Sequence, residues 1–279
     1  MTPQIQTRTL HAAVTLSGNT NGVVPALSLW WREIVRFYRN RSRVIGVIAS
    51  PLLFWIVIGS GFGSSFRSNA PGGQSHYLEY FFPGAVTMIV LFTSIFAMMS
   101  VIEDRKEGFL LSVLVAPVSR SVIVMGKVLG GSSLAAIQGL VFLAFTPFLK
   151  GAHLGIDNIV PIILTVFLIS FSLTALGFAI AWRMDSTQGF HAIVNLFLLP
   201  LWMLSGALFP LSGASGWIRA IMQINPVTYG NEALRQLIFP GSPSVLPVSI
   251  SLLILGAFSL VMFGSAFLVA SRRSTKPAA

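Results

Sequence analysis

The sequence contains no cysteine, and only 9% of its 279 residues are charged. The absence of cysteine excludes disulfide bonds, thiolate nucleophiles and cysteine metal sites. Soluble domains carry roughly 25% charged residues, so this composition excludes a cytosolic enzyme and a disordered chain. Because 54% of the residues are hydrophobic and the mean hydropathy is +0.80, we predict an all-α protein with several membrane spans.

Acidic residues are scarcer still, with 8 Asp and Glu against 18 Lys and Arg, for a net charge of +10. A basic excess of this size is typical of nucleic-acid-binding proteins. In an apolar chain it has a simpler origin, because the cytoplasmic loops of membrane proteins accumulate Lys and Arg. We therefore expect the lipid bilayer, and no nucleic acid, as a partner.

Catalytic and ion-coupling patterns are also lacking. The four histidines are scattered, no Gly-x-Ser-x-Gly sequence occurs, and no group of residues has the spacing of a metal site. The predicted spans contain no Asp or Glu, which argues against a carrier driven by protons or sodium. Gly126-Lys127 lacks the flanking residues of a phosphate-binding loop. We expect no catalytic residue, no metal and no cofactor in this chain, so any active work needs energy from another subunit.

Long hydrophobic runs predict six transmembrane helices, since a bilayer core needs roughly 20 apolar residues per helix. The runs that meet this length are residues 44–62, 81–102, 128–149, 159–182, 190–209 and 248–270. The third span is also compatible with a start near Val122, with Lys127 reaching toward the headgroups.

The distribution of basic residues predicts the orientation. Fourteen of the 18 Lys and Arg lie before the first span, after the second, after the fourth or after the sixth. The positive-inside rule then places both termini in the cytoplasm. The domains we predict are a flexible cytoplasmic N-terminus at 1–26, an interface helix at 27–43, a six-span domain at 44–270 and a cytoplasmic tail at 271–279.

Residues 27–43 predict an amphipathic helix. Arg32, Arg36 and Arg39 recur at helical spacing, and Trp30 and Trp31 fall on a neighbouring face. A helix with tryptophan on one side and arginine on another lies in the membrane interface. Both a simple topology anchor and a helix that also touches a cytoplasmic partner fit this pattern.

A second unusual segment follows span two. Five consecutive charged residues at 103–107 precede Gly108 and a short apolar run that ends before Pro117. This pattern favours a small helix lying across the cytoplasmic membrane surface over a solvated connector, because apolar residues such as Phe109 and Leu110 must pack against lipid or protein.

The third unusual segment, residues 210–247, lies between spans five and six. Its pattern predicts two short helices, 216–224 and 228–239, separated by Asn225-Pro226. Both are too apolar for a free loop and too short to span. We expect re-entrant helices that dip into the outer leaflet, where irregular backbone must be covered by protein.

Three local patterns resemble the ABC-2 type transporter permeases, the membrane subunits of one class of ABC exporters. The patterns are residues 103–108 with 116–120 and 125–127, residues 204–211, and residues 225–229 with 232–235. They follow the family's order and spacing, and the resemblance extends from Leu27 over nearly the whole chain. It is strongest to drug-resistance permeases of the daunorubicin-export kind, with exporters of lipo-oligosaccharide and polysaccharide as alternatives.

The resemblance implies a subunit in the plasma (inner) membrane of a prokaryote. It implies pairing with a second permease copy, in a homodimer, and with a cytoplasmic P-loop ATPase that binds ATP and magnesium. The segment after Glu103 would be the coupling helix seated in the ATPase, and spans two and five would line the pathway. The cargo would be a hydrophobic or amphiphilic small molecule or a lipid-linked glycan. Rival interpretations are a scaffold without transport and a secondary carrier or channel.

The candidate residues form four groups. The expected ATPase contacts are Glu103, Asp104, Arg105, Glu107 and Gly108. The interface-helix residues are Arg32, Arg36 and Arg39. The candidate pathway residues are Phe92, Thr93, Phe96, Asn195 and Met203. The outer re-entrant residues are Asn225, Pro226, Glu232 and Arg235. Asn195 and Gln138 are the most polar side chains deep in the spans, and amides there also serve to bond neighbouring helices.

Overall fold

The computed structural model describes residues 22–39, 41–62, 77–115, 118–242, 244 and 246–272, and these contain helices and turns without a strand. This confirms the all-α class. The elements in chain order are α1 (Val23–Arg39), α2 (Arg41–Gly61), α3 (Tyr77–Ala97), α4 (Met99–Lys106), α5 (Phe109–Val115), α6 (Arg120–Phe142), η1 (Leu143–Phe148), α7 (Ile156–Ala181), α8 (Thr187–Trp202), η2 (Met203–Ala207), η3 (Leu211–Gly213), α9 (Gly216–Ile224), α10 (Pro226–Ile238) and α11 (Val248–Ser271).

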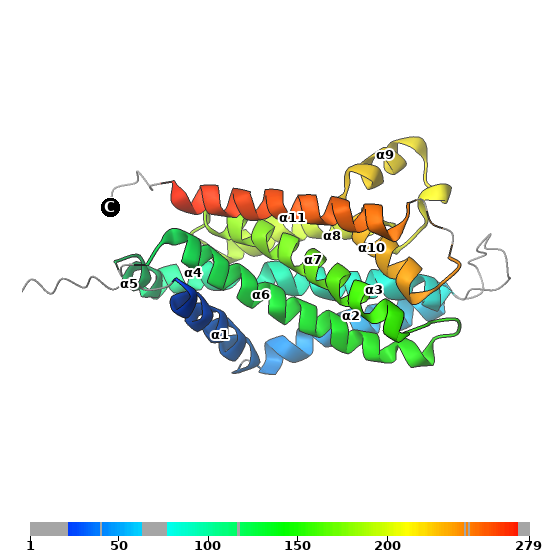
Figure 1. Cartoon of the computed structure of the whole chain (residues 1–279), viewed down its shortest axis with the longest axis horizontal. Coiled ribbons are helices and arrows are strands. Elements are labelled where there is room, and N and C mark those ends of the chain that lie inside the picture. Colours follow the sequence, from blue (N-terminus) through cyan, green and yellow to red (C-terminus); the bar gives the residue numbers. More distant parts are fainter. Residues whose placement is uncertain are drawn as a thin grey trace, which may run out of the picture.

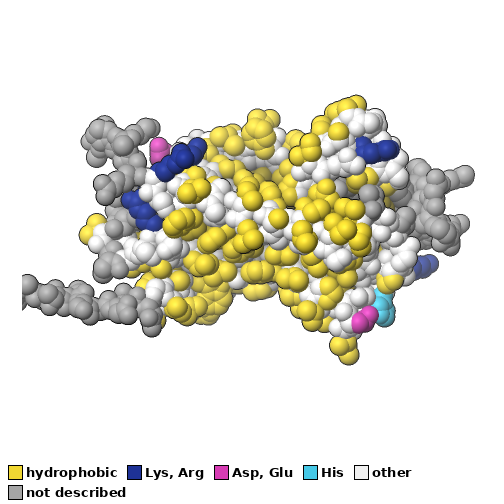
Figure 2. Space-filling view, turned by 45° about the horizontal axis from the view of Figure 1, so that its top comes forward, with side chains coloured by type: hydrophobic (Ala, Val, Ile, Leu, Met, Phe, Trp, Pro, Cys, Tyr) yellow, Lys and Arg dark blue, Asp and Glu magenta, His cyan; other side chains and the backbone are white. Residues whose placement is uncertain are grey.

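Among the described residues, six helical segments are long and apolar enough to cross a membrane, in agreement with the predicted number of spans. The second span consists of α3 and α4, the third of α6 and η1, and the fifth of α8 and η2. The segments run side by side along the long axis of the molecule (Figure 1). On the face shown in Figure 2, charged side chains gather at the two ends and the middle is apolar.

The second span is longer than the sequence predicts, running from Tyr77 to Lys106 instead of 81–102. It therefore carries Glu79, Glu103 and Asp104, so the expectation that no span contains a carboxylate is wrong. The helix continues into the charged run because partners within the protein neutralise Glu103 and Asp104, as described below.

The same span forms the centre of the bundle. In its apolar 18-residue stretch 83% is buried, whereas the corresponding stretches of the first and sixth spans are 19% and 17% buried. α3 packs against α2, α6, α7, α8 and α10. The first and sixth spans consequently offer most of their apolar surface to lipid or to another chain.

One end of the bundle, here called the α1 end, carries α1, α4 and α5 (Figure 1). α1 packs obliquely on α6 and buries Leu29, Glu33 and Phe37. It begins at Val23, four residues before the predicted start. Residues 1–21 of the predicted N-terminus, Pro117 and most of the predicted tail lie outside the described residues.

The opposite end, here called the α9 end, carries the two short helices expected between spans five and six. α9 matches the prediction, and α10 begins two residues earlier because Pro226 takes its first position. The Asn225 side chain accepts a hydrogen bond from the Val227 amide and caps this helix. α10 is buried between α3, α7 and α11, whereas α9 is mostly exposed.

Candidate functional site

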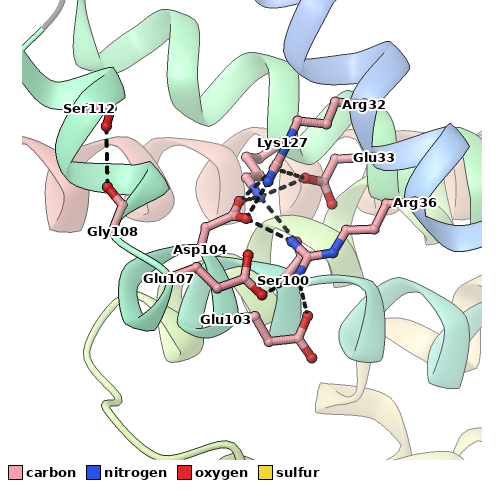
Figure 3. A network of polar contacts seen from close by, with 10 residues as sticks. All are labelled: Arg32, Glu33, Arg36, Ser100, Glu103, Asp104, Glu107, Gly108, Ser112 and Lys127. Carbon is pink, nitrogen blue, oxygen red and sulfur yellow. Dashed lines mark hydrogen bonds and ion pairs between the residues drawn. The ribbon is translucent and has the colours of Figure 1, made fainter.

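A cluster of charged side chains joins α1, α4 and α6 at the α1 end (Figure 3). Its centre is the carboxylate of Asp104, which is fully buried. Arg32 donates two hydrogen bonds to it, over 2.9 and 2.8 Å, and Arg36 donates one over 2.7 Å. The Lys127 ammonium donates a further bond to Asp104.

Lys127 is also buried, which shows that it does not reach toward the headgroups as expected. Its Nζ donates to Glu33 Oε1 over 2.6 Å and to Ser100 Oγ over 3.2 Å. Glu33 lies on the buried face of α1, one helical turn from both Leu29 and Phe37. The sequence pattern of arginines and tryptophans did not single out Glu33, and its only signal was a lone acid within an amphipathic helix.

The cluster contains three basic and four acidic residues. Arg36 completes it with an ion pair to Glu103 over 2.9 Å and a longer one of 3.4 Å to the exposed Glu107. The buried charged residues of this network are Glu33, Asp104 and Lys127. Buried charges are tolerated when each is paired and hydrogen-bonded, and this pairing explains why a charged run can end a membrane span inside the protein.

The contacts of the cluster also change the pKa of Arg32, which lies outside the spans. The hydrogen bonds to Asp104 hold the pKa of the Arg32 guanidinium above its usual value, against the opposing effect of burial. The Arg32 guanidinium lies 3.7 Å from the centre of the Phe109 ring. Arg32 therefore connects the buried cluster directly to the first residue of α5.

The predicted interface arginines thus take different places. Arg32 and Arg36 turn toward α4 and bind Asp104 and Glu103 of their own chain, so they do not form a free basic face. Arg39 is exposed. The large exposed apolar side chains of α1 include Trp31, with 59% of its surface exposed.

Some of the predicted ATPase contacts are bound within their own chain, and others are exposed. Asp104 and Glu103 belong to the charged cluster, and Arg105 bonds to the carbonyl oxygen of Trp182 over 2.6 Å. Glu107 is the most exposed acid of the run, with a longer contact of 3.4 Å to Arg36. Gly108 has a φ of 75°, the left-handed backbone that suits glycine in the turn before α5.

α5 is packed at its first turn and exposed at its last residue. Leu110 is buried against Leu29 of α1 and Ile123 of α6. Val115, at the other end of the helix, is 88% exposed. This short helix therefore projects from the end of the second span while its first turn is packed on α1 and α6.

The structure does not bring the five candidate pathway residues together. Thr93 is buried in the contact between α3 and α6, where its hydroxyl donates to Gln138 Oε1 over 2.6 Å. Phe92 and Phe96 stack on each other, and Phe96 lies 4.9 Å from the His191 ring of α8.

The other two, on the fifth span, form part of an open surface. Asn195 and Met203 are exposed, and they share one side of the helix with Leu196 and Leu199. We call these four residues the α8 face. It places an amide among apolar side chains in the middle of a membrane span.

The fifth span is broken at the α9 end. In η2 the backbone of Leu204 leaves the helical range, and Gly206 has a φ of 76°. Such a break frees carbonyl groups that a membrane interior cannot hydrate. The sequence signals it only by Gly206, because residues with a side chain rarely adopt this backbone conformation.

Side chains from α10 and α3 satisfy the freed carbonyls. Asn225 Nδ2 donates to the carbonyl oxygens of Leu201 and Leu204 over 2.6 and 3.0 Å. Arg235 donates to that of Gly206 over 2.8 Å.

The ion pair and the ring contact of Arg235 complete this arrangement. Arg235 also pairs with Glu232 over 3.3 Å, and its guanidinium lies 4.2 Å from the Tyr80 ring centre. The Tyr80 hydroxyl donates to the Gly206 carbonyl over 2.9 Å. Three of the four predicted outer residues, Asn225, Glu232 and Arg235, therefore gather at the break, whereas Pro226 only begins α10. Tyr80 joins them, although the sequence did not indicate it.

Comparisons with known proteins place these features in a family. The family model for the ABC-2 type transporter matches residues 26–239. A putative transport permease (ycf38) of Cyanophora paradoxa is 29% identical over 246 residues, covering 83% of this chain and 84% of the relative. The daunorubicin resistance ABC transporter permease protein DrrB1 of Streptomyces coeruleorubidus is 24% identical over 241 residues, covering 83% and 81%.

A further relative is the inner membrane transport permease YadH of Escherichia coli K12, 24% identical over 214 residues, which cover 75% of this chain and 80% of the relative. The family match takes in the charged cluster, α5, the broken fifth span and α10. The chain, with its six apolar spans, is a membrane transport permease and belongs to the ABC-2 type transporter family.

Proposed function

We propose that this chain is the membrane subunit of an ATP-driven exporter whose energy comes from a separate P-loop ATPase. That ATPase would bind ATP and magnesium, and this chain would bind neither. The observation that carries the proposal is the placement of α5, which projects from the second span next to the exposed Glu107 and is packed on α1 and α6. The α1 end would face the cytoplasm, with both termini on that side of an inner membrane.

The charged cluster would transmit the movement of the ATPase. ATP binding closes the ATPase subunits and displaces α5, which the Gly108 turn joins to α4. The carboxylate of Asp104 fixes the last turn of α4 to α1 and α6. A push on α5 would therefore shift packed helices between two arrangements, since a packed core switches between states and does not bend continuously. Glu107 would supply the charged contact with the ATPase.

A second copy of the chain would cover the α8 face. The amide of Asn195 would find a hydrogen-bond partner there, as polar side chains do between membrane helices. The neighbouring Phe92 and Phe96 are only partly buried. A pathway between two copies would then be lined by spans two and five, with adaptable aromatic and Met203 side chains facing an apolar cargo.

The helices at the α9 end would close the pathway on the outer side. α9 exposes Trp217, Ile221 and Ile224, a composition suited to the headgroup region of the outer leaflet. α10 is fastened to the broken fifth span through Asn225 and Arg235. Movement of the fifth span would thus move these re-entrant helices.

The cargo class follows from the apolar lining and from the relatives. One relative is named for daunorubicin resistance and the others for transport in general. A hydrophobic or amphiphilic small molecule is the proposed cargo, with a lipid-linked glycan as the alternative.

The test measures ATP-dependent accumulation of a panel of amphiphilic compounds, daunorubicin included, in inside-out vesicles containing the permease and its ATPase. We expect accumulation with the wild type and none with Glu107→Arg. The matched control is Asp157→Arg, which reverses an exposed acid at the first turn of α7 and should transport normally. Normal transport by Glu107→Arg would refute the coupling role, and a wild type that accumulates nothing would favour a scaffold.

A further inference from the structure

Arg105, next to Asp104 at the end of α4, fastens α4 to a different part of the molecule. Its guanidinium donates to the carbonyl oxygens of Trp182 and Met184 over 2.6 and 3.0 Å, and to Asp185 Oδ1 over 3.0 Å. These acceptors form the carboxyl end of α7 and the turn to α8. We call this set of bonds the Arg105 clamp.

A second arginine binds the end of another helix. It lies after α5, at the start of α6, whereas Arg105 lies before α5. Arg120 is the first residue of α6, and its guanidinium donates to the carbonyl oxygen of Ala270 over 2.7 Å, with a longer contact of 3.4 Å to that of Arg272. Ala270 lies in the last turn of α11, the sixth span. We call these bonds the Arg120 clamp.

Both clamps use the same physical chemistry. The last carbonyl groups of a helix have no partner within it, and the negative end of the helix dipole attracts cations. A guanidinium offers several donors in a rigid plane, so it can hold such an end in a fixed position and orientation. Each clamp therefore ties the carboxyl end of a membrane span to one side of the segment that contains α5.

We propose that Arg105 and Arg120 are positioning residues that carry a displacement of α5 to the fourth and sixth spans. This inference rests on the proposed function, because the displacement is the one the ATPase would cause. α5 is joined to the bundle through α4 before it and through α6 after it, and each of these helices carries one clamp. Asp104 ties α4 to α1 and α6, so the two clamps extend the moving unit to α7 and α11.

The test uses distances between spin labels, and the chain has no native cysteine to interfere. Exposed sites for the labels are Val115 in α5, Gln188 at the start of α8 and Ser271 at the end of α11. The Val115–Gln188 pair monitors the Arg105 clamp, and the Val115–Ser271 pair monitors the Arg120 clamp. Each distance is measured in the reconstituted permease–ATPase complex, without nucleotide and with ATP trapped by a hydrolysis-deficient ATPase.

In the wild type we expect each distance to keep the same centre in both states, because the three elements move together. Arg105→Gln should shift the first distance on ATP binding, and Arg120→Gln the second. The lysine variants, which retain a cationic donor, should restore the unshifted distance. The matched control is Arg183→Gln. It changes an exposed arginine in the α7–α8 turn, whose side chain forms no hydrogen bond or ion pair with another described residue.

A shift in the wild type, or no shift in either glutamine variant, would overturn the inference. If one glutamine variant does not fold, the other carries the test, since each clamp is claimed separately. Failure of the proposed function would give a different result, because the ATPase would then not co-purify with the wild type. A complex that forms and transports with both glutamine variants unshifted would leave the exporter intact and remove only the role of the clamps.

Discussion

Lys127 Nζ lies 2.6 Å from Glu33 Oε1, although 94 residues separate the two in the chain. Both side chains are buried, and Lys127 is shared with Asp104. The contact joins the third span to the helix that precedes the first span. It fastens α1 to the bundle.

The first prediction concerns this pair. Lys127→Met removes the nearest cation of the buried Glu33 carboxylate and leaves it only the longer contact of 3.7 Å to Arg32, and removing one partner of a buried pair costs about 3–5 kcal/mol. We expect the free energy of unfolding to fall by this amount, measured by thermal and denaturant unfolding in mild detergent. Glu33→Gln added to Lys127→Met restores the balance of charge and should recover part of the loss. A double variant no more stable than Lys127→Met would contradict the claim that charge balance matters.

A second prediction tests the close approach of α3 to the broken fifth span. A Cβ atom on Gly84 would lie 2.7 Å from Ala207 Cβ and 3.0 Å from its Cα, and the backbone there cannot move aside easily. Gly84→Ala should destabilise the protein by about 1–3 kcal/mol, the usual cost of overpacking. Gly256→Ala, at a helical glycine with open space around it, should be neutral or slightly stabilising. Equal unfolding temperatures for the two variants would argue against this contact.

The third prediction tests whether Thr93 serves the packing of α3 on α6 or lines the transport pathway. Thr93→Val removes the hydroxyl that donates to Gln138 Oε1, and an amide oxygen left buried and unpaired costs about 1–3 kcal/mol. Thr93→Val combined with Gln138→Leu removes both partners and should be closer to wild-type stability. The measurement is a double-mutant cycle on unfolding, with transport of several cargoes alongside. Altered cargo preference at unchanged stability would instead assign Thr93 to the pathway.

A fourth prediction concerns Arg235. Arg235→Met withdraws one of the two side-chain donors to the Gly206 carbonyl and the cation that pairs with Glu232, so we expect a loss of about 3 kcal/mol in stability. Arg219→Met is the control, since Arg219 is exposed and its bonds to loop carbonyls face water. It should cost less than about 1 kcal/mol. If the two variants unfold at the same temperature, Arg235 does not hold the broken helix.

The spans and the short helices could be predicted from sequence because their causes are local. Apolar runs of sufficient length give the six spans, and Pro226 after a capping asparagine fixes the break between α9 and α10. Gly108 likewise indicates the turn before α5.

The charged cluster could not be predicted, because its members come from three distant parts of the chain. Asp104 and Arg105 are adjacent in a run that looks solvated, yet one is buried against α1 and α6 and the other binds the end of α7. Hydropathy averages do not reveal that Glu33 and Lys127 neutralise each other. This long-range pairing also explains why the second span extends into the charged run.

The break in the fifth span could not be predicted from the sequence either. A glycine in an apolar run is common in membrane helices, so Gly206 alone does not predict a left-handed residue. The side chains that donate hydrogen bonds to the Gly206 carbonyl come from other helices. Arg235 belongs to α10 and Tyr80 to α3. The candidate pathway residues were chosen by type alone, and only the packing separates Thr93 from Asn195.

The most direct test of the account is purification of the full-length chain from its native membrane in mild detergent, followed by mass spectrometry of the bound proteins. We predict a P-loop ATPase at near equal stoichiometry, retained by the wild type and lost with Glu107→Arg. Its reproducible absence from preparations in which the permease is intact would contradict the claim that α5 receives the force of ATP binding.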